Sequence, residues 1–395
     1  MPLWVTIVLD GVGIGAQPDA HVYGDDGSDT LGHVCARELP QLPHLEALGL
    51  GCIASLEGIE ALAQPQASFG KMCEVSAGKD STTGHWELAG LMLDTPFPTY
   101  PNGFPADVVE AFIAQTGCGG VLGNIPASGT AIVEAHGADH EVTGYPIVYT
   151  SADSVFQVAA HVDVVPLEQL YAWCQIAREE ICVGSHAVGR VIARPFEGQG
   201  GAYQRISAKR KDYSLEPPSS PVQAILQAAG VKTVAVGKIA DLFAGVGFDV
   251  SHKTKSNAEG IQATLEHMQD LGSEHAFLWT NLVDFDQEYG HRNNPSGFAR
   301  ALEAFDAALP QLIAALPADS RLVITADHGN DPTTPSTDHS REYVPLLVID
   351  PAQPIGRDLG IRATFADHAA SLAKYFGLAY AGAGTAWETS RHPMT

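Results

Sequence analysis

The stretch from Leu322 to His339 constrains the fold more than any other part of this chain. It begins with an apolar, β-branched run, Leu322 to Thr325, which predicts a buried strand, and the run stops at Asp327-His328. In open α/β sheets, ligands bind just beyond the carboxyl ends of the strands, so an acid and an imidazole placed there indicate a site. A second Asp-His pair, Asp338-His339, follows in a polar loop.

The same order of buried strand and acid occurs at two other places. Trp4 to Leu9 is an apolar run that ends at Asp10, and Ala276 to Val283 leads to Asp286 and then to His291. A single aspartate at a strand end is usually a turn or cap residue. Because parallel α/β topology brings the carboxyl ends of strands to one edge of a sheet, three such ends together predict a shared site.

These strand ends and the polar loop offer carboxylate and imidazole ligands and no cysteine. The six candidate ligands are Asp10, Asp286, His291, Asp327, His328 and His339. Oxygen and nitrogen ligands in this number fit two divalent ions about 3.5–4 Å apart. The alternative is that all three places are ordinary strand-end turns with solvated acids and hydrogen-bonded histidines.

Chain length and the distribution of proline predict two domains. The chain has 395 residues, and proline density rises at Asp94–Pro105 and again at Leu215–Pro221. Two proline-rich joints on either side of roughly a hundred residues predict a domain inserted into a core. We therefore expect an α/β core, residues 1–98 and 218–395, whose mostly parallel sheet is flanked by helices, and an inserted α+β cap, residues 99–217.

Two elements outside the candidate site are also expected from local pattern. A strand over Gly189–Ala193 should end at Arg194, inside the cap. A helix over Pro295–Leu316 should be broken or kinked at Pro310, because proline removes a backbone donor and clashes with the preceding turn.

The charge of the chain excludes several partners. The formal net charge is −24, which excludes nucleic acid, since that partner requires a basic footprint, and an anionic membrane surface. An anionic substrate would need bound metals or local arginine and lysine to hold it. The basic segment Arg205 to Tyr213 indicates either an anion-binding patch or a solvated loop.

The cysteines and the N-terminal run predict a cytoplasmic protein. The six cysteines show no paired spacing, which predicts free thiols in a reducing cytosol. The run from Met1 to Leu9 lacks a basic segment and is short, so we expect a first strand and not a signal peptide. No apolar run is long enough to span a bilayer. Nothing in the sequence specifies an oligomeric state.

Three adjacent hydroxyls occur in the segment GKDSTTGHWELAG, Gly78 to Gly90. A hydroxyl becomes a nucleophile when a base or a metal lowers its pKa. Here a neighbouring glycine would permit close backbone approach, and a lysine could hold an anion. The alternative is that a hydroxyl caps a helix beginning at His85. Spacing alone does not choose between Ser81, Thr82 and Thr83.

Five longer motifs include these residues: GKDSTTGHWE, PIVYTSADSVFQ, VGKIADLFAG, NLVDFDQEYGHR and TADHGNDP, which begin at Gly78, Pro146, Val236, Asn281 and Thr325. With them the chain resembles bacterial phosphopentomutases of the alkaline phosphatase superfamily, over nearly its full length. The combination is highly specific, whereas the Asp and His pattern alone indicates only the superfamily. The chain departs from the family pattern at Gly11, where serine is common, at Lys211, where histidine is common, and at Ser81, where threonine is usual.

The resemblance implies an alkaline-phosphatase-like core and a role for each candidate residue. The hydroxyl immediately before Gly-His-Trp-Glu, here Thr83, would be the phosphorylated nucleophile and would bridge two ions. Asp286, His291 and His339 would hold one ion, and Asp10, Asp327 and His328 the other. The substrate contacts would be Ser151, Asp153, Arg194, Arg210 and Lys211 in the cap, with Lys238 of the core near the substrate.

The implied reaction interconverts ribose 1-phosphate and ribose 5-phosphate, and the 2-deoxyribose pair, through a phosphothreonine enzyme and a bisphosphate intermediate. The implied cofactors are two divalent ions, with Mn2+ preferred, and an activating sugar bisphosphate such as glucose 1,6-bisphosphate. The partners are then small pentose phosphates. The main alternative is a metal-dependent phosphatase or phosphodiesterase on the same core. A phosphoglycerate mutase and an inactive metal-binding protein have less support, because the motifs match the pentose enzymes and no ligand is missing.

Overall fold

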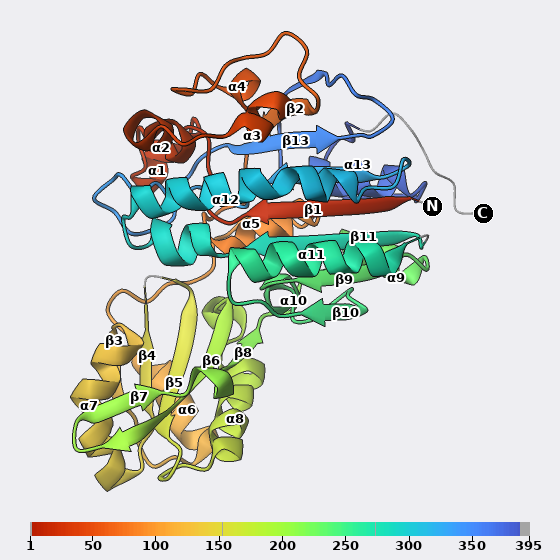
Figure 1. Cartoon of the computed structure of the whole chain (residues 1–395). Coiled ribbons are helices and arrows are strands. Elements are labelled where there is room, and N and C mark those ends of the chain that lie inside the picture. The colour runs from red at the N-terminus through yellow and green to blue at the C-terminus, as the bar shows by residue number, and fades with distance from the viewer. Residues whose placement is uncertain (1, 152, 273, 388–395) are drawn as a thin grey trace. The chain divides into compact units, whose positions relative to one another are not determined.

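The computed structural model describes residues 2–151, 153–272 and 274–387 (Figure 1). The chain forms two compact units, Met1–Pro96 with Pro217–Thr395, and Phe97–Glu216. The division thus falls at residues 96/97 and 216/217, compared with the expected 98/99 and 217/218. None of the helices in the described ranges has the length and the apolar character that crossing a bilayer requires.

The first unit is built on an eight-stranded sheet with the order β10-β9-β11-β1-β12-β13-β2-β14. Neighbouring strands from β10 to β12 pair in parallel, as do β2 and β14, whereas β13 is antiparallel to β12 and β2. The strands are β1 (Leu3–Leu9), β2 (Ser68–Met72), β9 (Lys232–Val236), β10 (Val250–His252), β11 (Ala276–Leu282), β12 (Arg321–Thr325), β13 (Val344–Ile349) and β14 (Asp358–Arg362). The expected mostly parallel sheet is confirmed.

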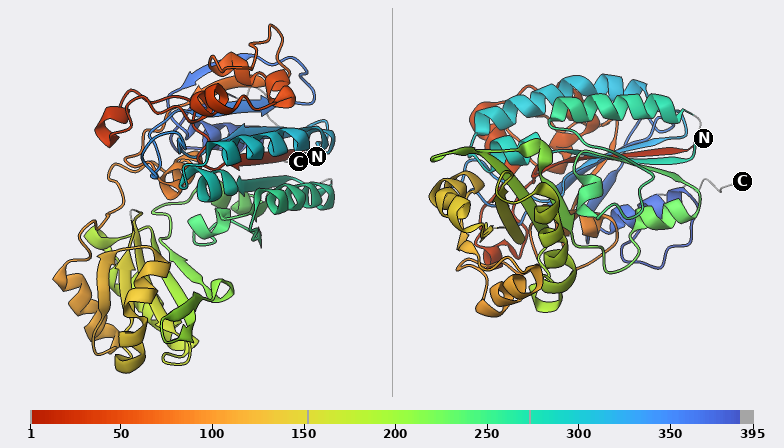
Figure 2. Two further views of the ribbon diagram at one scale, coloured as in Figure 1. Left: turned by 60° about the vertical axis from the view of Figure 1, so that its left-hand side comes forward. Right: turned by 90° about the horizontal axis from the view of Figure 1, so that it is seen from below.

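Helices lie on both faces of this sheet (Figure 2). On one face lie α11 (Asn257–Leu271) and α12 (Pro295–Ala314), and on the other α9 (Val222–Ala228) and α13 (Asp367–Tyr375). The remaining helices of the unit are α1 (Ala20–Tyr23), α2 (Thr30–Glu38), α3 (Pro43–Leu48), α4 (Leu50–Ile53), α5 (Ser81–Leu88) and α10 (Ile239–Leu242). Every residue of β1, β11 and β12 is buried, since both faces are covered, and this explains their continuous apolar sequences.

The register of the central strands places the candidate ligands at one edge of the sheet. Val8 of β1 pairs with Asn281 of β11 on one side and with Thr325 of β12 on the other. The residues just beyond these positions therefore emerge side by side at the carboxyl ends of three parallel strands, as the sequence predicted.

A buried histidine of α13 connects the sheet to α5. The ring of His368 lies with Nε2 2.8 Å from Thr6 Oγ1 and with Nδ1 2.9 Å from the carbonyl oxygen of Leu88. Burial lowers the pKa of His368 from 6.5 to about 4, because the folded environment disfavours the charged ring.

We expect this histidine to make the protein less stable in mild acid. In the unfolded chain His368 becomes protonated below about pH 6.5, whereas in the folded protein it becomes protonated only near pH 4. The free energy of unfolding therefore falls as the pH decreases through this window. Between pH 7 and pH 5 this one group lowers the free energy of unfolding by about 2 kcal/mol. Urea unfolding at the two pH values should show a smaller decrease for His368→Gln than for the native protein, and equal decreases would contradict the assignment.

The second unit is an α+β domain with its own core. Its sheet has the order β3-β4-β5-β6-β7, with β8 pairing to β6. The strands are β3 (Leu122–Pro126), β4 (Ile147–Thr150), β5 (Val155–His161), β6 (Arg190–Gln199), β7 (Ala202–Arg205) and β8 (Lys211–Ser214). Side chains of α6 (Ala106–Thr116) and α8 (Leu167–Ile176) form one apolar cluster with the strands, and those of α7 (Gly129–Thr143) form another.

Three local expectations were wrong. Strand β6 continues to Gln199 because β5, β7 and β8 pair along it, so Arg194 lies within the strand and not at its end. Helix α12 continues through Pro310, whose side chain is exposed, so the helix is not broken there. Helix α5 begins at Ser81, with Asp80 as its N-cap, and not at His85.

Candidate active site

Six side chains predicted as ligands lie at the carboxyl edge of the first unit's sheet or in its adjoining loops. Asp10 follows β1, Asp286 lies in the π-helical turn Phe285–Gly290 after β11, and Asp327 follows β12. These three carboxylates are buried. Three acids buried this closely repel one another unless cations accompany them.

Two groups of three potential ligand atoms form around Asp286. One group is Asp286, His291 and His339, and the other is Asp10, Asp286 and His328. In each group the ligand atoms lie within 4.8 Å of one another. Asp286 Oδ2 lies 3.2 Å from His291 Nε2, and Asp286 Oδ1 lies 3.5 Å from His339 Nε2. Asp286 is therefore placed to serve both groups, which the sequence had not suggested.

Asp327 lies beside the second group. Its Oδ2 atom is 3.4 Å from His328 Nε2, and its Oδ1 atom accepts a 3.1 Å hydrogen bond from the backbone N–H of Gly11. Gly11 has a φ of 74°, a conformation that favours glycine, and a Cβ atom there would come within 3.0 Å of Asn330. The departure from the family pattern at Gly11 therefore suits the turn that holds Asp327.

The donor set fits divalent cations. Both carboxylate oxygens of Asp10 are buried and have no hydrogen-bond partner of acceptable geometry among the described residues, although Lys238 Nζ lies 2.5 Å from Oδ2 as an ion pair. Burial disfavours a charged His328, but Asp327 and Asp10 outweigh it and raise the pKa of that ring to about 10. A site this negative is suited to bind metal ions.

The two histidines with backbone partners are oriented for coordination. His328 Nδ1 lies 3.0 Å from the carbonyl oxygen of Gly329, and His291 Nδ1 lies 2.6 Å from that of Thr337. A backbone carbonyl at Nδ1 selects the tautomer whose Nε2 lone pair is available to a metal. Both Nε2 atoms face acidic side chains of the candidate site, so both rings are oriented to coordinate a metal through Nε2.

The hydroxyls of α5 have different partners. Ser81 Oγ lies 2.7 Å from Lys238 Nζ and 3.1 Å from His328 Nε2, among the candidate ligands. Thr83 is fully buried, and its Oγ1 donates a 2.5 Å hydrogen bond to Asp80 Oδ2. In this structure the Thr83 hydroxyl, the expected nucleophile, is engaged by the helix N-cap, whereas that of Ser81 lies among the candidate ligands.

The physical reason is the phase of the helix. Residues two apart on a helix do not face the same direction, so Ser81 and Thr83 cannot both present their hydroxyls to one site. Gly84 lets α5 approach the strand end closely, since a Cβ atom there would lie 1.9 Å from the carbonyl oxygen of Asp327. This close packing places the first residue of the helix at the ligands.

Comparison with known proteins identifies the family. A family model described as the metalloenzyme superfamily matches residues 3–380. The phosphopentomutase of Caldanaerobacter subterraneus subsp. tengcongensis is 53% identical over 97% of this chain and 96% of its own length. That of Acetivibrio thermocellus is 54% identical over 95% of each chain. The chain belongs to the phosphopentomutase family. It is therefore an enzyme with an alkaline-phosphatase-like, metal-binding core, which confirms the resemblance and the fold class expected from the sequence.

A solved structure is also similar across the whole chain. The phosphoglycerate mutase of Leishmania mexicana shares 14% identity, covers 98% of this chain and 97% of its own, and superposes with a TM-score of 0.46.

Sequence reasoning missed two side chains that contact the site. His85 Nδ1 lies 2.8 Å from the carbonyl oxygen of Ser81 and 3.1 Å from Asp327 Oδ2, so it connects α5 to a predicted ligand. Asn330 is fully buried and donates a 2.7 Å hydrogen bond to Asp286 Oδ1. Both residues stand inside family motifs, and that position was the only signal of their importance.

The expected substrate contacts of the cap all belong to the second unit. Ser151 and Asp153 follow β4, Arg194 lies within β6, Arg210 directly precedes β8 and Lys211 begins it. Arg194 Nε donates a 3.1 Å hydrogen bond to Gln157 Oε1, and burial together with the charge of Arg210 lowers the pKa of Arg194 to about 10. Lys238, by contrast, belongs to the first unit and contacts Ser81.

Proposed function

We propose that this enzyme interconverts ribose 1-phosphate and ribose 5-phosphate, and the corresponding 2-deoxyribose phosphates. The observation that carries the proposal is the Ser81 hydroxyl held between His328 and Lys238 in a chain of the phosphopentomutase family. A hydroxyl beside two groups of metal ligands and one ammonium is equipped to accept and return a phosphoryl group.

The proposed phosphoacceptor is Ser81, so the enzyme form would carry phosphoserine in place of the expected phosphothreonine. Phospho-Ser81 would transfer its phosphoryl group to the free hydroxyl of the sugar phosphate, giving a sugar bisphosphate and restoring the serine hydroxyl. After the bisphosphate reorients, Ser81 would attack the other phosphate and release the isomeric monophosphate. Phosphate is neither gained nor lost in the cycle.

Two divalent ions, with Mn2+ preferred, would be held by the six named ligands. One set is Asp286, His291 and His339, and the other is Asp10, Asp327 and His328, with Asp286 placed between them. When bound, the ions supply Lewis acidity that favours the serine alkoxide and neutralises phosphoryl oxygens. The Lys238 ammonium adds charge there, because Asp10 and Asp327 raise its pKa against the opposing effect of burial.

The substrate would be held by the second unit's polar residues. Ser151 and Asp153 would bind the sugar hydroxyls, and Arg194, Arg210 and Lys211 the distal phosphate. These cations matter because the chain as a whole carries a net charge of −24, which repels phosphates at long range. A sugar bisphosphate such as glucose 1,6-bisphosphate would prime the enzyme by phosphorylating Ser81.

All six cysteines are free, which supports a reducing, cytoplasmic location.

A direct assay distinguishes a mutase from a phosphatase on the same core. Incubation with ribose 5-phosphate, Mn2+ and a trace of glucose 1,6-bisphosphate should yield ribose 1-phosphate with little inorganic phosphate. Chelation of the metal should stop the reaction, and added Mn2+ should restore it. Release of inorganic phosphate without ribose 1-phosphate would instead establish the phosphatase alternative.

A further inference from the structure

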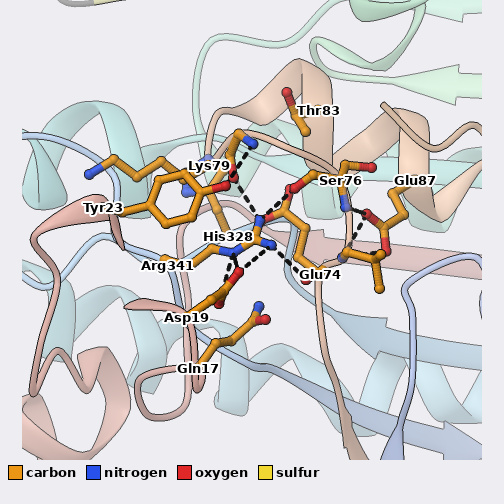
Figure 3. A network of polar contacts seen from close by, with 12 residues as sticks. Gln17, Asp19, Tyr23, Glu74, Ser76, Lys79, Thr83, Glu87, His328 and Arg341 are labelled. Carbon is orange, nitrogen blue, oxygen red and sulfur yellow. Dashed lines mark hydrogen bonds and ion pairs between the residues drawn. The ribbon is translucent and has the colours of Figure 1, made fainter. Parts of the chain in front are cut away.

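One buried arginine, Arg341, binds the backbone around Glu74 and Ser76 (Figure 3), in the segment that precedes α5. Arg341 is 2% exposed and lies between β12 and β13. Its Nη1 donates to the carbonyl oxygens of Ser76 (2.8 Å) and Gly78 (2.7 Å), and its Nη2 to that of Glu74 (2.8 Å). Three alternate carbonyls of the segment 74–79 are therefore bound by one guanidinium group.

Two carboxylates balance the charge of this guanidinium. Glu74 Oε2 lies 2.9 Å from Nη1, and Asp19 Oδ2 lies 3.0 Å from Nη2. Burial lowers the pKa of Arg341, but Glu74 and Asp19 outweigh it, so the group stays charged. The planar guanidinium presents its donors in fixed directions, whereas a lysine ammonium offers its protons from a single point. Lysine therefore cannot reproduce this set of contacts.

The N–H groups of the same segment are held from other sides. Glu87 of α5 accepts hydrogen bonds from the N–H groups of Val75 (3.0 Å) and Ser76 (2.6 Å). The hydroxyl of Tyr23 accepts one from Gly78 (3.2 Å). With its carbonyls bound by Arg341 and its N–H groups bound elsewhere, the segment has little freedom just before α5 begins.

The loop that carries Arg341 also carries a predicted metal ligand. His339 precedes Arg341 by two residues, and the N–H of Arg341 donates to Asp25 Oδ2 at 2.9 Å. The same carboxylate of Asp25 pairs with Lys79 Nζ at 3.1 Å. One loop therefore holds both a ligand of the site and the approach to the phosphoacceptor.

We propose that Arg341 is a positioning residue for phosphoryl transfer: it fixes the segment 74–79 so that the Ser81 hydroxyl stays beside His328 and Lys238. The inference rests on the proposed role of Ser81. Displacing a reacting group by about 1 Å can cost on the order of 100-fold in rate, so losing these contacts should affect the chemical step more than substrate binding.

The test compares Arg341→Lys with a matched control, Arg321→Lys. Arg321 is also buried, pairs with Asp350 at 2.8 Å, and begins β12 at the end of the strand away from Asp327. Arg341→Lys should retain its bound Mn2+ and a KM for ribose 5-phosphate within about 3-fold of native. Its kcat and the single-turnover phosphorylation by glucose 1,6-bisphosphate should fall on the order of 100-fold. The control should keep native rates.

A second variant keeps the test informative if Arg341→Lys fails to fold. Asp19 is 44% exposed in its side chain, so Asp19→Asn should fold normally while weakening the hold on Arg341. We expect the same separation of kcat from KM, on the order of 10-fold. Native phosphorylation rates in Asp19→Asn and in folded Arg341→Lys, or an equal loss in the Arg321 control, would overturn the inference.

Hydrogen exchange separates this inference from the identity of the phosphoacceptor. Amide exchange in the peptide spanning residues 74–83 should accelerate in both variants, whichever hydroxyl is phosphorylated. Unchanged exchange there would refute the positioning role even with Ser81 phosphorylated. Peptide mapping of the native phosphoenzyme tests Ser81 independently.

Discussion

Replacing Ser81 by alanine should reduce mutase activity by about 1,000-fold or more, because the phosphoryl group would have no acceptor. Ser81→Thr should stay active, since it keeps the hydroxyl that contacts Lys238 and His328. Fragmentation of the peptide that contains residues 80–90, after priming with a sugar bisphosphate, should place the phosphate on Ser81.

Thr83→Val is the matched control for this experiment. It preserves side-chain shape but removes the hydroxyl that donates to Asp80, so it should cost some stability while leaving phosphorylation intact. Phosphate found on Thr83, or an active Ser81→Ala enzyme together with an inactive Thr83→Val enzyme, would show that Thr83 is the phosphoacceptor, as the motif alone suggested.

Asp286→Ala should empty both metal sites, because this carboxylate belongs to both groups of ligand atoms. His291→Ala should remove only one ion, since that ring belongs to the first group. Elemental analysis should give two Mn2+ per native chain, one per His291→Ala chain and close to none for Asp286→Ala. Activity should fall on the order of 1,000-fold or more in Asp286→Ala, since metal-stabilised phosphoryl transfer is lost.

Asp284→Asn provides the control for this pair. Asp284 stands two residues before Asp286, and its Oδ2 accepts a 2.8 Å hydrogen bond from the N–H of Asn257, away from the ligand groups. Its replacement should leave two ions bound. Two ions retained by Asp286→Ala, or both lost from His291→Ala, would show that Asp286 is not shared.

The sequence by itself determined the sheet and the edge at which the site lies. β1, β11 and β12 are covered on both faces, so each is a continuous apolar run that local pattern detects. An acid within a few residues of the end of such a run emerges at the strand's carboxyl end, which is why Asp10, Asp286 and Asp327 could be selected from the sequence. The family motifs added the class of chemistry.

Only the tertiary structure decided which groups face one another. The N-cap at Asp80 sets the phase of α5, and that phase turns Ser81 to the candidate ligands and Thr83 away from them. Asp286 is brought to Asp10, His328 and His339, and Arg341 to residues 74–79, across more than forty residues of sequence. Such contacts depend on how elements pack and on where each helix begins, and neither is encoded in the local pattern of polar and apolar residues.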